Sequence, residues 1–235
     1  MNAELQSIRR MLRNEGMTVH PIKTRAPYMR SHGFSPDVVI DVGVGSGTPW
    51  LYRSFPNARF VLIDPRPECA DMVREKDHLE TFHFHATALG ASAGTATLTM
   101  PYSKKGREAN MASLFHRTDK LSKAFVKTEE IEVPVKTLDE IALAYPGRVG
   151  LKLDTEGSEL DILRGASETL NRCDFVTLEM SVSPRFDGIG APSEAVALLA
   201  QAGLEMRDII TVGAGPGKKA HPRYLDILFT RWANA

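Results

Sequence analysis

Cysteine is scarce in this sequence, and long apolar runs are missing. The 235 residues include only Cys69 and Cys173, which lie far apart and without the spacing of metal ligands. We therefore expect two reduced thiols in a cytoplasmic protein rather than a disulfide. No apolar run approaches the length that spans a membrane. Residues 1–10 are too charged for a signal peptide, so we expect neither a membrane span nor export.

An excess of either charge is also absent. Lys+Arg and Asp+Glu both number 29, so the formal net charge is zero. A general nucleic-acid binder carries a basic excess, and we therefore expect no nucleic-acid partner. A hydrophobic content of 43% and a charged content of 25% are ordinary for a globular protein. The length fits one α/β domain with a large core.

The most informative stretch begins where an apolar run ends. Val38-Val-Ile40 leads into Asp41-Val-Gly-Val-Gly-Ser-Gly-Thr48, and a second apolar run, Phe60-Val-Leu-Ile63, ends in Asp64. This order is typical of a strand–loop–helix–strand unit that binds a nucleotide-like cofactor at the carboxyl ends of its strands. The glycines allow a tight turn and a close approach of backbone to ligand. Asp64 stands where a carboxylate accepts hydrogen bonds from two ribose hydroxyls.

The spacing of the glycines bears on the identity of the cofactor. The dinucleotide fingerprint is Gly-x-Gly-x-x-Gly, but Thr48 occupies the third glycine position here and Gly47 comes one residue early. Asp41 would repel a pyrophosphate, whereas it suits the positive charges of S-adenosylmethionine. A Tyr-x-x-x-Lys pair, common in nicotinamide-dependent oxidoreductases, is not evident. The pattern favours S-adenosylmethionine and leaves a dinucleotide oxidoreductase as the alternative.

Apolar and polar segments then alternate in a way that predicts repeated β–α units. The strands are expected at about 38–41, 60–63, 81–89, 150–153, 175–179, 205–212 and 224–230. Only the short loop Gly213–Pro222 joins the last two strands, so they should pair antiparallel. The predicted fold is α/β and Rossmann-like, with a mainly parallel seven-stranded sheet, an antiparallel last strand and helices on both faces.

Two segments fall outside that repeat. Residues 1–36 comprise an amphipathic helix, Glu4–Asn14, and an irregular lead-in. We expect this part to cover the mouth of the site or to pair with a second subunit, which makes a homo-oligomer possible. Residues 37–235 are expected to form one domain with a β-rich and loop insertion at about 91–136.

Several stretches resemble the FkbM-type family of methyltransferases, which have the class I methyltransferase fold. The similar segments are Asp41-Val-Gly-Val-Gly-Ser-Gly-Thr-Pro-Trp-Leu-Tyr52, Leu62-Ile-Asp-Pro65, His85-Ala-Thr-Ala-Leu-Gly90, Val133-Pro-Val-Lys-Thr-Leu-Asp-Glu140, Leu151-Lys-Leu-Asp-Thr-Glu-Gly-Ser-Glu-Leu160 and Leu178-Glu-Met-Ser-Val182. The most specific is the Leu151–Leu160 segment, because all class I methyltransferases share the glycine loop. The resemblance runs in order from about Val38 to Phe229 and so covers most of the chain.

This resemblance implies methyl transfer from S-adenosylmethionine, usually to a hydroxyl oxygen of a sugar or another small molecule. The expected cofactor-binding residues are Asp41, Gly43, Val44, Gly45, Asp64, Pro65 and Ala88. The resemblance assigns the glycine loop to the methionine and ribose part of the cofactor, Asp64 to the ribose and Ala88 to the adenine. Pro65 is apolar and is expected to pack on the base.

Three carboxylates are the candidates on the acceptor side. Asp154 and Glu179 are expected at the carboxyl ends of adjacent strands, and Glu156 lies in the turn after Asp154. An aliphatic hydroxyl must lose a proton, either to a carboxylate or with the help of a divalent metal. We predict Asp154, Glu156 and Glu179 as the catalytic residues. A metal at Asp154 and Glu179 is the alternative, as is a carboxylate that holds the cofactor's ammonium.

Basic residues in the predicted mouth loops bear on the acceptor's charge. Arg185, Lys104, Lys105 and Arg107 are expected there, together with His221 in the loop 213–222. They favour an anionic acceptor unless they are simply solvated. The leading hypothesis is O-methylation of a small-molecule hydroxyl. The alternatives are N-methylation of a small molecule and adenosyl-cofactor binding without catalysis.

Overall fold

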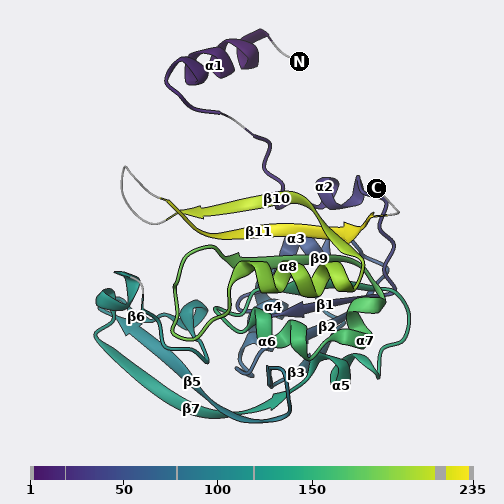
Figure 1. Ribbon diagram of the computed structural model, residues 1–235, viewed down its shortest axis with the longest axis vertical. Coiled ribbons are helices and arrows are strands. Elements are labelled where there is room, and N and C mark those ends of the chain that lie inside the picture. Colours follow the sequence, from purple (N-terminus) through teal and green to yellow (C-terminus); the bar gives the residue numbers. More distant parts are fainter. Residues whose placement is uncertain (1–2, 19, 78, 119, 215–220, 233–235) are drawn as a thin grey trace.

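The computed structural model describes residues 3–18, 20–77, 79–118, 120–214 and 221–232. Its centre is a seven-stranded sheet in the order β10-β11-β9-β8-β1-β2-β3 (Figure 1). These strands are β1 Val38–Val42, β2 Arg59–Ile63, β3 His83–His85, β8 Val149–Leu153, β9 Cys173–Ser181, β10 Leu204–Ala214 and β11 Pro222–Arg231. The first five of them run parallel, and β11 is antiparallel to both β9 and β10. The predicted sheet, mainly parallel with an antiparallel last strand, is confirmed.

Helices cover both faces of this sheet, as predicted. They are α2 Ala26–Arg30, α3 Pro49–Tyr52 and α4 Cys69–Asp77 on one face, and α5 Leu138–Ala142, α6 Glu159–Arg164, α7 Ser167–Asn171 and α8 Pro192–Gln201 on the other. The two-residue period of a strand decides which layer each side chain enters. Val38, Ile40 and Val42 of β1 pack with the α5–α8 layer, whereas Val39 packs with the α2–α4 layer. The same alternation directs Asp41 toward α3.

A second, four-stranded sheet lies at one end of the molecule in the order β4-β7-β5-β6. Its strands are β4 Ala88–Leu89, β5 Gly94–Ser103, β6 Gly106–Arg107 and β7 Lys127–Lys136, with 3₁₀ turns η1 at Ala109–Met111 and η2 at Lys120–Ala124. The single strand expected at 81–89 is wrong, because β3 belongs to the main sheet and β4 to the second. The chain turns at Thr87, whose amide donates to His85 O (3.0 Å) and whose hydroxyl donates to Pro134 O in β7 (2.9 Å).

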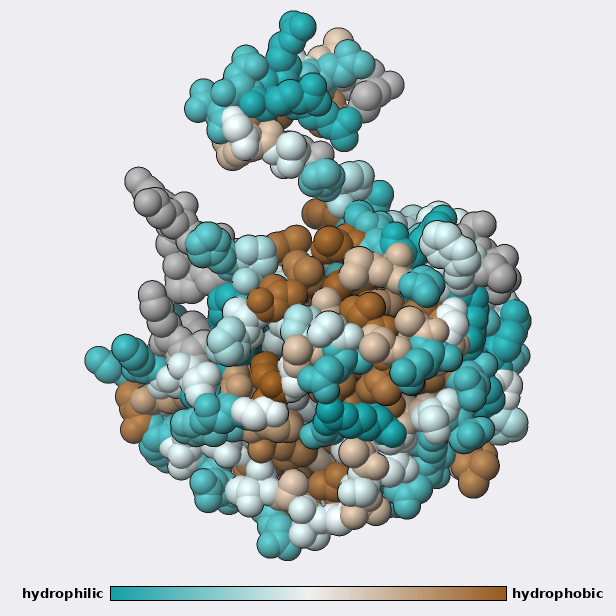
Figure 2. Space-filling view, in the orientation of Figure 1, coloured by the Kyte–Doolittle hydropathy of each residue, from teal (hydrophilic) through white to brown (hydrophobic). Residues whose placement is uncertain are grey.

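The N-terminal helix α1 (Ala3–Asn14) stands apart from both sheets (Figure 1) and contains no buried residue. Its apolar stripe, Leu5, Ile8 and Met11, is at least 41% exposed. The two roles expected for this segment, a cover for the mouth or a subunit contact, stay predictions. Apolar side chains also gather on the face that β10, β11 and α8 present (Figure 2). Within the described ranges, no helix is long and apolar enough to cross a membrane.

Candidate functional site

A cavity of about 400 Å³, here called the main cavity, opens at the carboxyl ends of β1, β2, β8 and β9. Parallel strands bring their carboxyl ends to one edge of a sheet, which is where open α/β sheets bind ligands. The predicted residues in its wall are Gly43, Val44, Gly45, Asp64, Pro65, Ala88, Asp154, Glu156 and Glu179. Asp41 is the one predicted residue that does not line it.

The loop after β1 needs glycine because its backbone passes very close to the end of β8. Gly43 has φ +75°, and a Cβ at this position would lie 1.8 Å from the carbonyl oxygen of Asp154. Gly45 has φ +54°, in the left-handed region that disfavours side chains. The amide of Gly43 donates to Ile63 O (3.0 Å), and the amide of Asp154 donates to Val42 O (3.1 Å). These contacts hold the loop between β2 and β8.

Asp41 is fully buried and is bound to other side chains of the protein. Tyr52 Oη donates to Asp41 Oδ2 at 2.7 Å, and Lys152 Nζ lies 3.2 Å from Asp41 Oδ1. Burial alone would lower the pKa of Lys152, but the charges of Asp41 and Asp154 outweigh it and raise that pKa. Lys152 therefore stays charged and supplies the positive partner that we expected from a ligand. The assignment of Asp41 to the cofactor stays a prediction, with its carboxylate bound here to Tyr52 and Lys152.

Asp64 lies in the cavity wall, but its carboxylate is already engaged. Arg66 donates to it from Nε (2.9 Å), from Nη2 (2.9 Å) and from its backbone amide (3.0 Å), and Gly45 N donates to Oδ2 at 3.1 Å. The Nη1 atom of Arg66 reaches Ala109 O in the insertion at 2.5 Å. Both partners of the pair are buried, with 2% of Asp64 and 7% of Arg66 exposed.

The turn after β8 is shaped by one buried carboxylate. Glu159 accepts hydrogen bonds from the amides of Thr155 (2.7 Å) and Gly157 (3.1 Å) at the start of α6. This turn holds Glu156 at φ +57°, the only non-glycine residue with positive φ in the part of the chain that the structure describes. A strained conformation of this kind persists only where its surroundings enforce it. The turn thereby projects the Glu156 side chain toward the cavity and the insertion.

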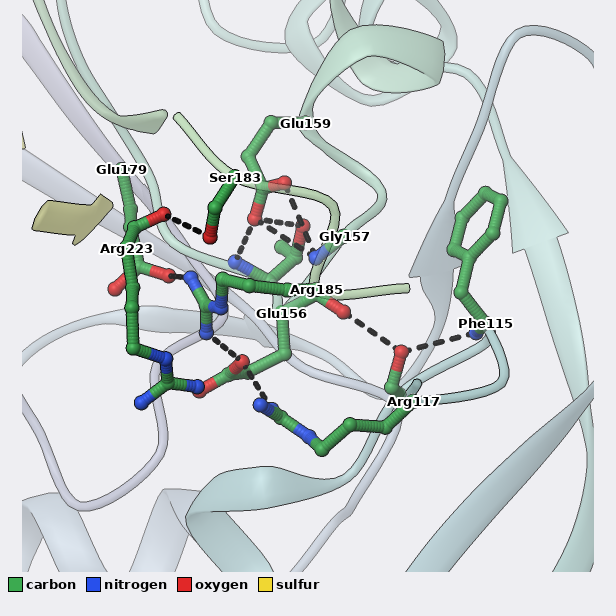
Figure 3. Close-up of polar contacts among 11 residues, drawn as sticks. Phe115, Arg117, Glu156, Gly157, Glu159, Glu179, Ser183, Arg185 and Arg223 are labelled. Atoms are coloured by element: carbon green, nitrogen blue, oxygen red, sulfur yellow. Dashed lines mark hydrogen bonds and ion pairs between the residues drawn. The ribbon is translucent and has the colours of Figure 1, made fainter. Parts of the chain in front are cut away.

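Two arginines converge on Glu156 (Figure 3). Arg117 Nη2 lies 2.5 Å from Glu156 Oε2, and Arg185 Nη2 contacts the same oxygen. Arg185 also donates from Nη1 to Glu179 Oε1 at 2.6 Å, so one guanidinium bridges two predicted catalytic carboxylates. The backbone sets these arginines side by side, because Arg117 pairs with Phe186 in an antiparallel bridge and Thr118 N donates to Arg185 O (2.9 Å).

The carboxylates of the site differ in their environment. Burial, followed by the negative charges of Asp154 and Glu156, raises the pKa of Glu179 well above the ordinary range of a glutamate, and Arg185 only partly opposes this shift. Asp154 is 38% exposed, with Lys152 Nζ 3.3 Å from its Oδ2. Among the described residues, no group of three or more His, Cys, Asp or Glu side chains is arranged to hold a metal ion. The carboxylate of Asp154 pairs with the ammonium of Lys152, and that of Glu179 pairs with the guanidinium of Arg185.

Several site residues were missed by sequence reasoning. Lys152 had a usable signal, since a lysine stands inside the buried apolar strand β8. Trp50, which lines the main cavity, stands in the family-like segment Asp41–Tyr52 but was not singled out. Arg66 and Arg117 had no signal, because nothing in their local sequence marks them. The basic residues expected in the mouth loops lie in different environments. Arg185 is buried, Arg107 pairs with Glu68 (2.9 Å), and Lys104 and Lys105 are exposed. His221 is exposed, while most of its loop, residues 215–220, lies outside the described residues.

Comparisons with known proteins show the family to which the chain belongs. Residues 41–214 match the family model described as the methyltransferase FkbM domain. The chain is 25% identical over 145 residues to Methyltransferase 1 of Beauveria bassiana (55% of this chain, 58% of that protein). It is also 25% identical over 156 residues to Methyltransferase sdnD of Sordaria araneosa (55% and 60%). The match thus spans about three-fifths of the length of these relatives.

A solved structure shows the same fold. Methyltransferase FkbM from Methylobacillus flagellatus KT superposes with a TM-score of 0.51 at 13% sequence identity, covering 90% of this chain and 48% of that one.

Proposed function

The chain belongs to the FkbM methyltransferase family, and from this we propose that it transfers the methyl group of S-adenosylmethionine to a hydroxyl of a small molecule. The observation that carries the proposal is the convergence of the glycine loop, Asp64 and the Asp154–Glu156 turn on one cavity. A volume of about 400 Å³ suits a cofactor with a small acceptor.

The lining of the main cavity fits an adenosyl cofactor. Val44, Pro65 and Ala88 offer apolar surface for a base, and the Asp64 carboxylate offers acceptors for ribose hydroxyls once the side chain of Arg66 moves away from it. The acidic pair Asp154 and Glu156 suits the cofactor's positive charges. When bound, S-adenosylmethionine supplies both the methyl group and its leaving group. Asp41 has a supporting role here, since it holds Lys152 beside Asp154.

We assign the proton transfer to Asp154. Its side chain is exposed to the cavity, whereas Glu179 is buried and held by Arg185. A carboxylate that is open to the cavity is the one within reach of an acceptor hydroxyl. Glu156 and Glu179 are both held by Arg185, so we assign them to positioning of the acceptor. The main task of the other residues in the cavity wall is to orient the cofactor and the acceptor toward each other.

Calorimetric titration tests the cofactor. Wild-type protein and Asp64→Ala are titrated with S-adenosylmethionine, S-adenosylhomocysteine and NADH. We expect binding of both adenosyl ligands alone, weakened in the variant because two acceptors for ribose are lost. Binding of NADH in their place would contradict the proposal and would restore the dinucleotide alternative.

A matched pair of variants tests catalysis. Hydroxyl and amine acceptors are screened for release of S-adenosylhomocysteine, with and without Mg²⁺, and the accepted substrate is used for Asp154→Asn and Asp161→Asn. The two aspartates are similarly exposed, 38% and 37%, but Asp161 pairs with Arg164 outside the cavity. We expect Asp154→Asn to lower kcat by about 10²–10⁴. Its S-adenosylhomocysteine affinity should fall by a much smaller factor, and Asp161→Asn should stay active.

Other outcomes of that screen are informative. Turnover of amines only would refute the O-directed assignment. Cofactor binding without turnover of any acceptor, unchanged in Asp154→Asn, would favour a non-catalytic binding protein.

A further inference from the structure

A second cavity, of about 250 Å³, lies inside the insertion between β5 and residues 111–128, and we call it the insertion cavity. One strip of chain separates it from the main cavity. Asn110, Ala112 and Leu114 line the main cavity, whereas Met111, Ser113 and Phe115 line the insertion cavity. The strip begins in the 3₁₀ turn η1 and continues through Ser113, and successive side chains face opposite cavities. The strip is fixed to β5 by two hydrogen bonds between the backbones of Thr99 and Ser113 (2.9 and 3.1 Å).

The lining of the insertion cavity is both apolar and basic. Phe115, Phe125 and Val126 provide apolar surface, and His116, Arg117 and Lys127 provide basic groups. None of the described lining residues is an Asp or Glu. The surrounding sequence shows the same bias: residues 101–127 contain seven Lys or Arg and two Asp or Glu, in a chain of zero net charge. A basic excess concentrated in one segment attracts anions to it.

The cationic group of this cavity is held in place before any ligand arrives. The Arg117 side chain is only 6% exposed and its guanidinium lies 4.5 Å from the centre of the Phe186 ring. Arg117 also contacts Glu156, which lines the main cavity, so one side chain touches both sites. Ser113 adds a second link, since its hydroxyl donates to Glu156 O at 2.7 Å. Preorganised charge lowers the ordering cost of binding.

We propose that the insertion cavity binds an amphipathic organic anion, with an aromatic or apolar body and one acidic group. The body lies against Phe115 and Phe125, and the acidic group faces Arg117 and Lys127. Because Arg117 holds Glu156, a bound anion competes for the same guanidinium and thereby links this cavity to the main one. The site is separate from that of the cofactor and does not depend on the methyl-transfer assignment.

The test uses the fluorescent probe 1-anilinonaphthalene-8-sulfonate, titrated into protein saturated with S-adenosylhomocysteine. Three variants place new side chains at exposed valines, so that the core is left intact. Val126 (59% exposed) lines the insertion cavity, and Val212 (53% exposed) lies on β10 and serves as the matched site. Val126→Glu adds a negative charge, Val126→Gln adds the same bulk without it, and Val212→Glu controls for charge elsewhere.

We expect the probe to bind in the presence of S-adenosylhomocysteine. Its Kd should rise about tenfold in Val126→Glu, corresponding to about 1.4 kcal/mol, and clearly less in Val126→Gln and Val212→Glu. The neutral analogue N-phenyl-1-naphthylamine should bind more weakly than the sulfonate. Any of three results would overturn the proposal. They are displacement of the probe by S-adenosylhomocysteine, an equal loss of probe affinity in Val126→Glu and Val212→Glu, and an equal affinity for the neutral analogue. Because cofactor binding is measured separately, failure here leaves the proposed methyl transfer standing.

Discussion

Arg66→Gln is expected to destabilise the folded protein and at the same time to strengthen its binding of cofactor. The Asp64 carboxylate accepts four hydrogen bonds, three from Arg66 and one from the amide of Gly45. An ionised carboxylate offers about four acceptor sites, so none is left for a ribose. Binding a ribose at Asp64 therefore requires the side chain of Arg66 to leave.

The two effects can be given magnitudes. Removing one partner of a buried ion pair costs about 3–5 kcal/mol, and only 2% of Asp64 and 7% of Arg66 are exposed. Two backbone amides still serve Asp64 in the variant, so we expect a loss near 3 kcal/mol in the free energy of unfolding. In the variant no arginine has to be displaced. We expect the S-adenosylhomocysteine affinity to rise about tenfold, since charged hydrogen bonds of about 1.5–3 kcal/mol are no longer broken and the freed arginine regains only part of that in water.

Thermal denaturation and calorimetric titration with S-adenosylhomocysteine measure the two effects separately. Arg74→Gln is the control, because Arg74 forms an ion pair with Asp71 in which both side chains are more than half exposed, 54% and 75%. That pair should contribute less than about 1 kcal/mol and leave ligand binding unchanged. If Arg66→Gln bound S-adenosylhomocysteine more weakly than wild type, Arg66 would belong to the bound state and the reasoning would be refuted.

Three further predictions follow from the same geometry. Gly43→Ala should abolish S-adenosylhomocysteine binding in a calorimetric titration, because the new Cβ would lie 1.8 Å from the carbonyl oxygen of Asp154. Binding of S-adenosylhomocysteine should change the tryptophan fluorescence of wild type and of Trp232→Phe but not of Trp50→Phe, since Trp50 lines the main cavity and Trp232 is 72% exposed. Burial and then the charge of Asp154 raise the pKa of Asp226 from 3.8 to about 6, so this group's contribution to stability is lost as the pH rises from about 4 to 6. Asp226→Asn should therefore gain stability over wild type across that window, by at most about 3 kcal/mol, in a series of thermal denaturations; a constant difference would contradict it.

The main sheet could be predicted because its signals are local. Val38-Val-Ile40 and Phe60-Val-Leu-Ile63 are short apolar runs that end in acids, and both form buried strands. Thr137 and Glu140 also form a local signal, a capping box at the start of α5, with the Glu140 amide donating to the Thr137 hydroxyl (3.2 Å) and the Thr137 amide donating to Glu140 Oε2 (2.8 Å). The split at Thr87 could not be predicted, because it depends on a hydrogen bond to Pro134, 47 residues further along the chain.

The positions of the site carboxylates could also be predicted, but their partners could not. Strand ends fix where Asp41, Asp64 and Asp154 lie, since parallel strands end at one edge. Their charges are balanced by residues that the fold brings from elsewhere, such as Lys152, which is 111 residues from Asp41. An acid beside a glycine loop therefore indicates that a cation lies near it, and tertiary structure decides whether that cation is a ligand or a lysine. Here Lys152 neutralises Asp41, and the acids that line the main cavity are Asp64, Asp154, Glu156 and Glu179.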